Sequence, residues 1–509
     1  MPDSSPKPER MMPPLPLLVF AVGASALGME IAAVRLLAPY FGASTIVWAN
    51  TIGVVLVALS IGYWLGGRLA DKRPSMRDLC AVIMLASLMT AALPYAARPL
   101  LDVGVDALDS INAGAFVGSM IATLVLVALP VLLLGTAAPW ALRIGIERVE
   151  DAGALAGRLY AVSTLGSLVG TIASALILVP WVGTRRTFLI FALITALAAL
   201  PGLLPKMRWP AVVPLAILVL LAIPGGTIKS QASDGRVIFE TETEYQYARV
   251  VERPDGSRTL ELNEGNAVHS LYRPGAGLTG DYWDYALVLP FAANAKPPAR
   301  VAVLGNAGGT IASLFGRLMP ATRVDGVEID AKLTEIGRRY FALDNPRFQA
   351  FHEDARPYLR RTGRSYDAIV VDAYRQPYIP FYLTTHEFFE LARERLTPAG
   401  TVMINVGHPE GDQQLDKVLT ATLGSVFEHV ARVPAEPTNT LLIASRSPIS
   451  ADAMRRATAQ RSPQLAALGG IAASELSPPL IGGEIYTDDD APVEWLIDKS
   501  IVQYSSDAK

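Results

Sequence analysis

Glycines and acidic residues recur directly after apolar stretches in the C-terminal half of the chain. The stretch RVAVLGN runs into a turn that contains Gly305, Gly308 and Gly309, and glycines at such a turn let the backbone approach a ligand closely. The next apolar stretch ends in Glu328, 19 residues after Gly309. A carboxylate at about this distance can accept hydrogen bonds from a ribose diol. The two motifs together predict a nucleoside-binding site.

Two aspartates continue this series at the ends of the following apolar stretches. Asp354, which precedes Ala355, can accept a hydrogen bond from an adenine amino group. Asp372 follows the buried run 367–371 and should lie at the edge of the sheet, facing the pocket. Any one of these acids could instead cap a helix or lie on the surface. Their succession favours the nucleoside site.

The elements that position these motifs follow from the hydrophobic pattern. The predicted strands are 300–305, 323–329, 347–352, 367–372, 400–406, 427–433 and 439–444. Amphipathic segments separate them, which predicts a Rossmann-like, doubly wound α/β sheet whose ligands bind beyond the carboxyl ends of the strands. Residues 235–273 alternate apolar and polar side chains between turns, which predicts a small antiparallel sheet before it.

The N-terminal half of the chain is strongly apolar. Seven runs are long enough to cross a bilayer as helices. They lie at 14–38, 45–66, 78–97, 113–141, 159–180, 186–204 and 209–227. We therefore predict a polar tail at 1–13, a polytopic membrane domain at 14–227 in contact with lipid, an antiparallel β-subdomain at 228–298 and the Rossmann-like domain at 299–509.

Composition excludes several classes of function. The formal net charge of −3 gives no basic field for nucleic acid. Cys80 is the only cysteine, so intramolecular disulfides and cysteine-based zinc sites are excluded. The five histidines lack metal-binding spacing, and the acidic run 488–490 is typical of a helix start before Pro492. We expect no metal. The apolar stretch after residue 13 is too long for a cleavable signal peptide.

Two charged residues interrupt the first apolar run. Glu30 and Arg35 are costly at membrane depth, and such groups usually face a bundle interior or a polar cavity. Their spacing of five is not that of an ideal intrahelical pair. They predict a polar site in the bundle, with an alternative in which Arg35 reaches the membrane interface and Glu30 pairs with another helix.

The side of the membrane that the C-terminal domain occupies is open to two arguments. Eleven basic residues between 7 and 208 fall on one side of the predicted spans, and three fall on the other. The positive-inside rule then places the N-terminus in the cytoplasm of an inner-membrane protein, and seven crossings place the C-terminal domain outside. Adenosine-type sulfonium compounds are made in the cytosol, and on that ground we favour a cytoplasmic domain.

The stretch from about 240 to 495 resembles the spermidine synthase (polyamine aminopropyltransferase) family, and the whole chain resembles its membrane-fused branch. The matching pieces are Tyr245-Gln246, LNEG at 262–265, Tyr282-Trp283-Asp284-Tyr285, the glycine-rich turn, VEID at 327–330, Asp354-Ala355, VVDAY at 370–374, LTTHEFF at 383–389 and TDDDAPVEW at 487–495. Their order and spacing make the resemblance specific.

The resemblance implies roles for these residues. In the family, carboxylates at the positions of Glu328 and Asp354 bind ribose and adenine, and one at the position of Asp372 helps to deprotonate the attacking amine. The implied donor is decarboxylated S-adenosylmethionine, the acceptor putrescine or another polyamine, the by-product methylthioadenosine and the assembly a homodimer. The remaining site residues are Tyr282 beside Asp372, Gln246 on the nucleoside side, and Tyr245, His269, Asp284, Tyr374 and Arg375 in the acceptor pocket.

Departures from the family pattern raise alternatives. Ala307 stands where the family has an aspartate that binds the donor's ammonium, and Arg375 stands where it has a second, polyamine-binding aspartate. An arginine beside a dication repels it by about 1 kcal/mol or more at partial burial. A transferase or lyase that uses intact S-adenosylmethionine is one alternative. A non-enzymatic membrane sensor or transporter that responds to a nucleoside or polyamine is another.

Overall fold

The structure is a computed structural model that describes residues 14–42, 45–110, 114–204, 208–223, 229, 232, 234–263, 265, 267–374, 378–497 and 499. The chain divides into two compact units. The helical unit comprises Met1–Ser230 and Glu242–Tyr247, and the second unit comprises Gln231–Thr241 and Ala248–Lys509. Each unit is described by itself.

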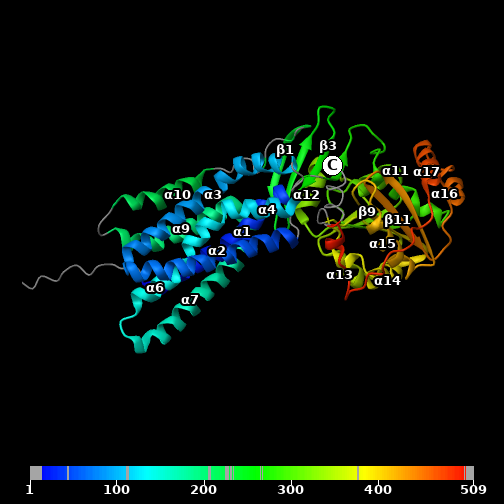
Figure 1. The fold of residues 1–509 in the computed structure, drawn as a ribbon. Helices are drawn as coiled ribbons and strands as arrows, with labels where there is room; N and C mark the ends of the chain where they lie inside the picture. Colours follow the sequence, from blue (N-terminus) through cyan, green and yellow to red (C-terminus); the bar gives the residue numbers. More distant parts are fainter. Residues whose placement is uncertain are drawn as a thin grey trace, which may run out of the picture. The chain divides into compact units, whose positions relative to one another are not determined.

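The helical unit is a bundle of helices, drawn from blue to green in Figure 1. Its helices are α1 (Leu15–Phe41), α2 (Thr45–Lys72), α3 (Met76–Ser110), α4 (Gly114–Leu126), α5 (Ala128–Gly135), α6 (Ala137–Gly145), α7 (Ala152–Ala173), α8 (Val179–Val182), α9 (Thr184–Leu203) and α10 (Val212–Ala222). Glycines let α7 approach α1 closely. A Cβ built on Gly170 would lie 1.9 Å from the carbonyl oxygen of Ala24, so the pair can pack only with glycine there.

Six helices of the described chain are long and apolar enough to cross a membrane, by length and composition. The sequence predicts seven, and the difference lies in the last run. The apolar helix there is only 11 residues long, or about 16 Å, against a hydrocarbon core of about 30 Å. Large apolar side chains on the outside of the bundle, such as Trp181 and Leu176, are 80% and 69% exposed.

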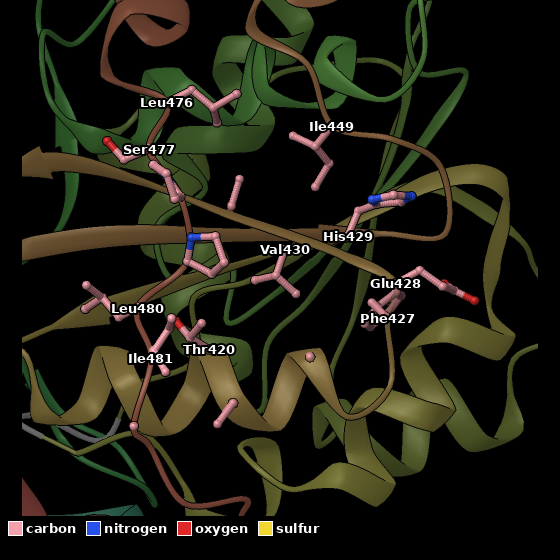
Figure 2. Close-up of a pocket in the computed structure, with 16 residues that line it drawn as sticks. Thr420, Phe427, Glu428, His429, Val430, Ile449, Leu476, Ser477, Leu480 and Ile481 are labelled. Atoms are coloured by element: carbon pink, nitrogen blue, oxygen red, sulfur yellow. The ribbon is translucent and has the colours of Figure 1, made fainter.

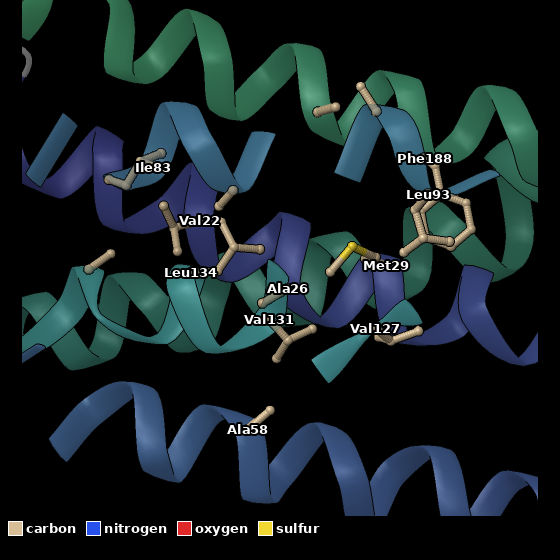
Figure 3. Close-up of a cluster of buried hydrophobic side chains, with 14 of the residues drawn as sticks. Val22, Ala26, Met29, Ala58, Ile83, Leu93, Val127, Val131, Leu134 and Phe188 are labelled. Atoms are coloured by element: carbon tan, nitrogen blue, oxygen red, sulfur yellow. The ribbon is translucent and has the colours of Figure 1, made fainter. Parts of the chain in front are cut away.

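The interior of the bundle is filled by aliphatic side chains from many of its helices. Figure 3 shows one buried cluster that contains Met29 of α1, Leu93 of α3, Phe188 of α9, and Val127, which lies between α4 and α5. Phe188 and Met29 are fully buried. Burial of side chains of this size contributes about 1.5–3 kcal/mol each in water, although helices within lipid associate mainly through packing contacts of this kind.

The second unit contains the two predicted sheets. The small one has the order β1-β2-β3-β4, from β1 (Arg236–Glu242), β2 (Tyr247–Glu252), β3 (Arg258–Leu262) and β4 (Val268–Tyr272). The large one has the order β10-β11-β9-β8-β5-β6-β7. Its strands are β5 (Arg300–Leu304), β6 (Arg323–Val327), β7 (Phe348–Phe351), β8 (Tyr366–Val371), β9 (Leu396–Gly407), β10 (His429–Glu436) and β11 (Asn439–Ser445). The predicted fold class is confirmed.

Helices cover both faces of the large sheet (Figure 1). Two separate apolar clusters fill its two sides. One cluster includes α11 (Thr310–Leu318), α16 (Ala451–Thr458) and α17 (Pro463–Glu475). The other includes α13 (Ala355–Arg361), α14 (His386–Glu394) and α15 (Gln414–Gly424). The amphipathic helix α12 (Ala331–Tyr340) packs toward the small sheet.

The strand order reverses between β5 and β8, which are parallel neighbours. A crevice forms beyond the carboxyl ends of the strands at such a reversal, and ligands of doubly wound sheets bind there.

Candidate active site

The reversal of strand order brings the glycine-rich turn and Asp372 together. The backbone N–H of Asp372, directly after β8, donates to the carbonyl of Leu304 at the end of β5, at 2.8 Å. Gly305 follows with φ +85°, and a Cβ there would lie 2.4 Å from the Cα of Ala373. Only glycine fits this crossing of two backbones. The turn therefore fixes the position of the Asp372 side chain.

The Asp372 carboxylate receives hydrogen bonds from neighbouring side chains, which include Tyr282, Asn405 and Trp283. The Tyr282 hydroxyl donates to it at 3.2 Å, and the Asn405 amide nitrogen donates to it at 2.9 Å. The Asn405 amide is itself oriented, because its oxygen accepts from the side-chain nitrogen of Asn439 at 2.9 Å. Burial raises the pKa of Asp372 to about 7, against the lowering effect of these donors. The group can therefore gain and lose a proton near neutral pH.

Asp372 and Tyr282 line a cavity of about 580 Å³. Tyr374 also lines it, and its hydroxyl donates to the carbonyl of Asn405 at 2.9 Å and accepts from the N–H of Gly407 at 2.6 Å. His269 lines the same cavity, and burial lowers the pKa of its ring to about 4. The structure thus brings four of the predicted site residues together.

The other predicted acceptor-pocket residues are Asp284, Arg375 and Tyr245. Asp284 is 2% exposed, and its carboxylate accepts from the N–H groups of Thr279 and Gly280 at 2.9 and 2.7 Å, so it holds a loop and is not part of the cavity wall. Arg375 lies outside the described residues. Tyr245 belongs to the segment 242–247, which groups with the helical unit.

The predicted ribose ligand Glu328 binds the glycine-rich turn itself. Its carboxylate accepts from the N–H of Ala307 at 2.8 Å and from that of Asp330 at 3.0 Å. Burial raises the pKa of Glu328 to about 7. Ala307 has φ +45°, a left-handed conformation that is unfavourable for alanine, and this hydrogen bond holds it. Glu328 therefore organises the turn on which a nucleoside would lie.

The remaining nucleoside-side residues have structural partners. Asp354 caps α13 through the N–H of Arg356 at 2.9 Å and accepts from the Tyr382 hydroxyl at 2.6 Å, and Ala355 is the first residue of that helix. The N–H of Gly308 donates to the Ser270 hydroxyl at 2.8 Å, and Gly309 begins α11 with φ +85°. Asp354 is thus a helix cap, the alternative given above, and its role toward adenine stays a prediction.

The predicted site residues Gln246, Glu30 and Arg35 belong to the helical unit. Gln246 lies in a turn where its N–H donates to Thr243 Oγ1 at 3.0 Å. Glu30 is buried in α1. The guanidinium of Arg35 donates to the carbonyl of Glu244. The polar membrane site therefore stays a prediction.

Several polar residues of the cavity wall were not predicted from the sequence, among them Asn405, Asn439 and Glu436. Asn405 is a lone polar residue within the apolar stretch of β9, which is the one signal that could have singled it out. Over the described ranges, no group of three or more His, Cys, Asp or Glu residues could hold a metal ion.

A second cavity, of about 660 Å³, lies between α15, the start of β10 and the segment 476–482. Figure 2 shows Thr420, Leu480 and Ile481 on one side and Val430 beside them, while Glu428 and His429 lie at its far end. Its wall is mostly apolar and contains none of the residues that surround Asp372.

Comparisons with known proteins find similar sequences for the C-terminal part of the chain. The family model described as the spermine/spermidine synthase domain matches residues 287–452. A probable polyamine aminopropyl transferase of Bifidobacterium longum is 34% identical over 204 residues, which cover 40% of this chain and 45% of that protein. The polyamine aminopropyltransferase of Vibrio vulnificus is 32% identical, over 29% of this chain and 50% of that protein. This chain thus spans about half the length of these two relatives.

Another relative matches more of the chain at lower identity. Polyamine aminopropyltransferase 1 of Streptomyces coelicolor is 24% identical over 425 residues, covering 77% of this chain and 75% of that protein. Among solved structures, a probable spermidine synthase from Corynebacterium glutamicum covers 50% of this chain and 98% of its own, with a TM-score of 0.39 at 22% identity. Residues 287–452 of this chain are therefore similar to the spermine/spermidine synthase domain, and an N-terminal unit of apolar helices precedes them.

Proposed function

We propose that this chain is a membrane-bound aminopropyltransferase. It would transfer the aminopropyl group of decarboxylated S-adenosylmethionine to an amine and release methylthioadenosine. The observation that carries the proposal is the buried Asp372 carboxylate, which lines a cavity, has a pKa near 7 and is held by Tyr282 and Asn405. The names of the similar curated proteins support the same reaction class.

The chemistry of this transfer needs a base. An amine enters as an ammonium, which has no free electron pair, so it must lose a proton before it attacks. Asp372 takes that proton. The nitrogen then forms a bond to the aminopropyl carbon, while the bond from that carbon to the sulfonium breaks and its electron pair returns to sulfur. The enzyme's other task is alignment of the two reactants, which Tyr282 serves by fixing the carboxylate.

Turnover by the purified full-length chain tests this function. Decarboxylated S-adenosylmethionine is supplied with a panel of mono-, di- and triamines, and methylthioadenosine is measured by chromatography. We expect release that depends on at least one amine. A chain that binds the donor and releases no methylthioadenosine with any amine would exclude the proposal.

Intact S-adenosylmethionine is a second candidate donor. Ala307, which lines the cavity, offers only a methyl group where the family has the aspartate for the donor's ammonium. Calorimetry with the two donors separates these candidates, because the preferred one binds more tightly. Tighter binding of the decarboxylated donor would reject the second candidate.

The helical unit's own contacts bear on membrane sidedness. Residues 242–247 belong to this unit, and Glu242 accepts from the N–H of Thr184, the first residue of α9, at 2.7 Å. Glu244 accepts from Arg35, near the end of α1. The Arg185 guanidinium donates to the carbonyl of Ile223, after α10, at 3.0 Å. These contacts all lie at the end of the bundle where α1 ends and α9 begins.

We therefore expect Glu244 to lie on the membrane face opposite the basic loops, outside the cytoplasm by the positive-inside rule. This favours the charge argument over the one from donor supply. Cys80 is buried and is the only cysteine, so single cysteines can be labelled against a silent background. In intact cells, a membrane-impermeant maleimide should label Glu244→Cys and spare Asp151→Cys, an exposed position between α6 and α7. The reverse labelling would place the domain in the cytoplasm.

A further inference from the structure

Glu30 is a carboxyl group in the interior of the bundle that the proposed transferase function does not use. The residue is 7% exposed, and its Oε2 has no hydrogen-bond partner among the residues that the structure describes. Glu30 lies 11 residues before Phe41, where α1 ends, which is about 16 Å along the helix. An ionised carboxylate at this depth is very costly unless a cation or a proton neutralises it.

The charged residues of the surrounding helices lie toward the helix ends. Two of the helices that pack against α1, α4 and α5, contain no ionisable residue. The guanidinium of Arg35, on α1 itself, donates to the carbonyl of Glu244. The charged residues toward the ends of the other neighbouring helices include Arg68, Arg98, Arg143, Arg158 and Arg185. The uncharged ionisable groups of these helices at pH 7 are Tyr63, Tyr95, Tyr160 and Cys80. A proton is therefore the simplest group that neutralises Glu30.

A file of buried polar groups leads from the end of α1 into the bundle. The helix α2 begins soon after α1 ends, and the Asn50 amide nitrogen of α2 donates to the Ser119 hydroxyl of α4 at 3.0 Å. Next to this pair, Thr51 Oγ1 lies 3.5 Å from Thr123 Oγ1, and both threonines are fully buried. The helix α1 packs against both α2 and α4. Thr123 lies nine residues into α4, or about 14 Å along it, so the file reaches nearly to the depth of Glu30.

The two threonine oxygens face each other as acceptors. Thr51 donates its hydroxyl proton to the carbonyl of Val47 at 2.9 Å, and Thr123 donates its own to the carbonyl of Ser119 at 2.7 Å. A hydroxyl has one proton and two lone pairs, so neither oxygen can also donate to the other. The group that satisfies both is a donor such as water or a hydronium ion. The pair is therefore suited to pass a proton along the file.

Two further hydroxyls lie at the turn of α1 that carries Glu30. Ser174 Oγ donates to the carbonyl of Gly28 at 2.8 Å, and Thr90 Oγ1 donates to the sulfur of Met29 at 3.5 Å. Met29 belongs to the buried cluster in Figure 3. Ser174 begins a π-helical turn, and such turns are frequent at functional sites. Polar groups of several helices therefore gather at the depth of Glu30.

We propose that Glu30 is a proton-binding site of the helical unit that exchanges its proton with water at the membrane face where α1 ends. On uptake, a hydronium ion reaches the carboxylate past Thr51 and Thr123, gives up its proton and leaves as water, and release is the reverse. A carboxyl group that changes between neutral and charged forms within a span is typical of proton relays in pumps and transporters. The helical unit then has an activity of its own, which does not depend on the transferase function.

Infrared spectroscopy of the full-length chain in lipid bilayers tests the protonation state. An ordinary glutamate is ionised at pH 7, whereas Glu30 should be protonated. The spectrum of the wild type minus that of Glu30→Gln should therefore contain the carbonyl band of a protonated carboxyl group. Glutamine has the shape and neutrality of the protonated acid, so the variant should fold. Ionised carboxylate bands, which a bound metal cation would also give, would overturn the inference.

Glu150→Gln is the matched control. Glu150 is exposed in the segment between α6 and α7, and its difference spectrum should contain only ionised carboxylate bands. If Glu30→Gln does not assemble, the wild type decides with dicyclohexylcarbodiimide, which modifies protonated carboxyl groups in apolar surroundings. Mass spectrometry of the peptide that contains Glu30 should find the adduct at pH 7, and an unmodified peptide would reject the proposal.

Hydrogen–deuterium exchange of the same band tests the route. After transfer to heavy water, the Glu30 band of the wild type should shift as its proton is replaced. Thr51→Val combined with Thr123→Val removes both hydroxyls at nearly constant shape and should slow this shift at least about tenfold. Thr187→Val is the control, because the buried Thr187 hydroxyl lies on α9 and donates to the carbonyl of Gly183 at 2.9 Å. A double variant that exchanges as fast as this control would overturn the route past the two threonines.

Discussion

Replacement of Asp372 by asparagine is expected to lower kcat for amine-dependent methylthioadenosine release by roughly 10²- to 10⁴-fold, the usual contribution of a general base. Asparagine keeps the oxygen that accepts from Asn405, so the wall of the cavity should remain in place. It cannot take a proton from the ammonium. Rapid-quench or steady-state measurement of methylthioadenosine with saturating donor and amine reads the effect directly.

The role of Asp372 as a base also predicts the direction in which the reaction rate changes with pH. The reaction needs the deprotonated carboxylate, and the pKa of Asp372 is about 7. The wild-type rate should therefore rise as pH increases through about 7 and level off above it. The residual rate of Asp372→Asn should lack this rise.

Asp452→Asn is the control for the same substitution on the surface. Asp452 pairs with Arg455 on α16, with its side chain 71% exposed, and the variant should keep the wild-type rate and pH profile. An Asp372→Asn enzyme within about fivefold of the wild type would show that another group removes the proton.

The large sheet could be predicted from the sequence because its strands carry a local signal. The parallel strands β5 and β8 are buried along nearly their whole length and read as continuous apolar runs. The helical unit could be predicted for a similar reason, since apolar length alone identifies a span. The last run, 209–227, was predicted as a full span, but the described helix in it is shorter than that prediction. Its composition is apolar, but the helix that forms there ends after Ala222.

From the residue pattern alone, the candidate site could be predicted where a residue directly follows a strand, whereas Tyr282, Tyr374 and His269 were predicted from the family resemblance. Asp372 and Gly305 were found this way, because β5 and β8 end side by side. Asn405 and Asn439 meet because β9 and β11 pair in antiparallel register, which brings the end of β9 beside the start of β11. Glu436 reaches Tyr282 across 154 residues. Such contacts depend on tertiary packing, which no local pattern in one sequence reveals.

Glu328 has a structural role that the sequence did not predict. The sequence singled it out for ribose hydroxyls, yet both of its carboxylate oxygens accept from backbone N–H groups, those of Ala307 and Asp330. These bonds hold Ala307 in its left-handed conformation. The turn that would lie against a nucleoside is therefore shaped by this side chain before any ligand arrives, which lowers the entropic cost of binding.

Replacement of Glu328 by glutamine should consequently damage the turn as well as any ribose contact. The amide NH₂ of glutamine is a donor, so whichever way it points it faces one of the two N–H donors and leaves that buried donor unsatisfied. The cost is about 1–3 kcal/mol. We expect methylthioadenosine to bind at least about tenfold more weakly by calorimetry, and the thermal midpoint of the C-terminal unit to fall.

Glu335→Gln supplies the matched control for this prediction. Glu335 lies on α12, close in sequence to Glu328. Its side chain is 63% exposed and pairs with Lys332 of the same helix. Exposed pairs of this kind contribute little, so its loss should change neither binding nor the thermal midpoint. If Glu328→Gln bound methylthioadenosine as tightly as this control, the glycine-rich turn would not depend on the carboxylate. The nucleoside would then have to be held by other residues at this edge of the sheet.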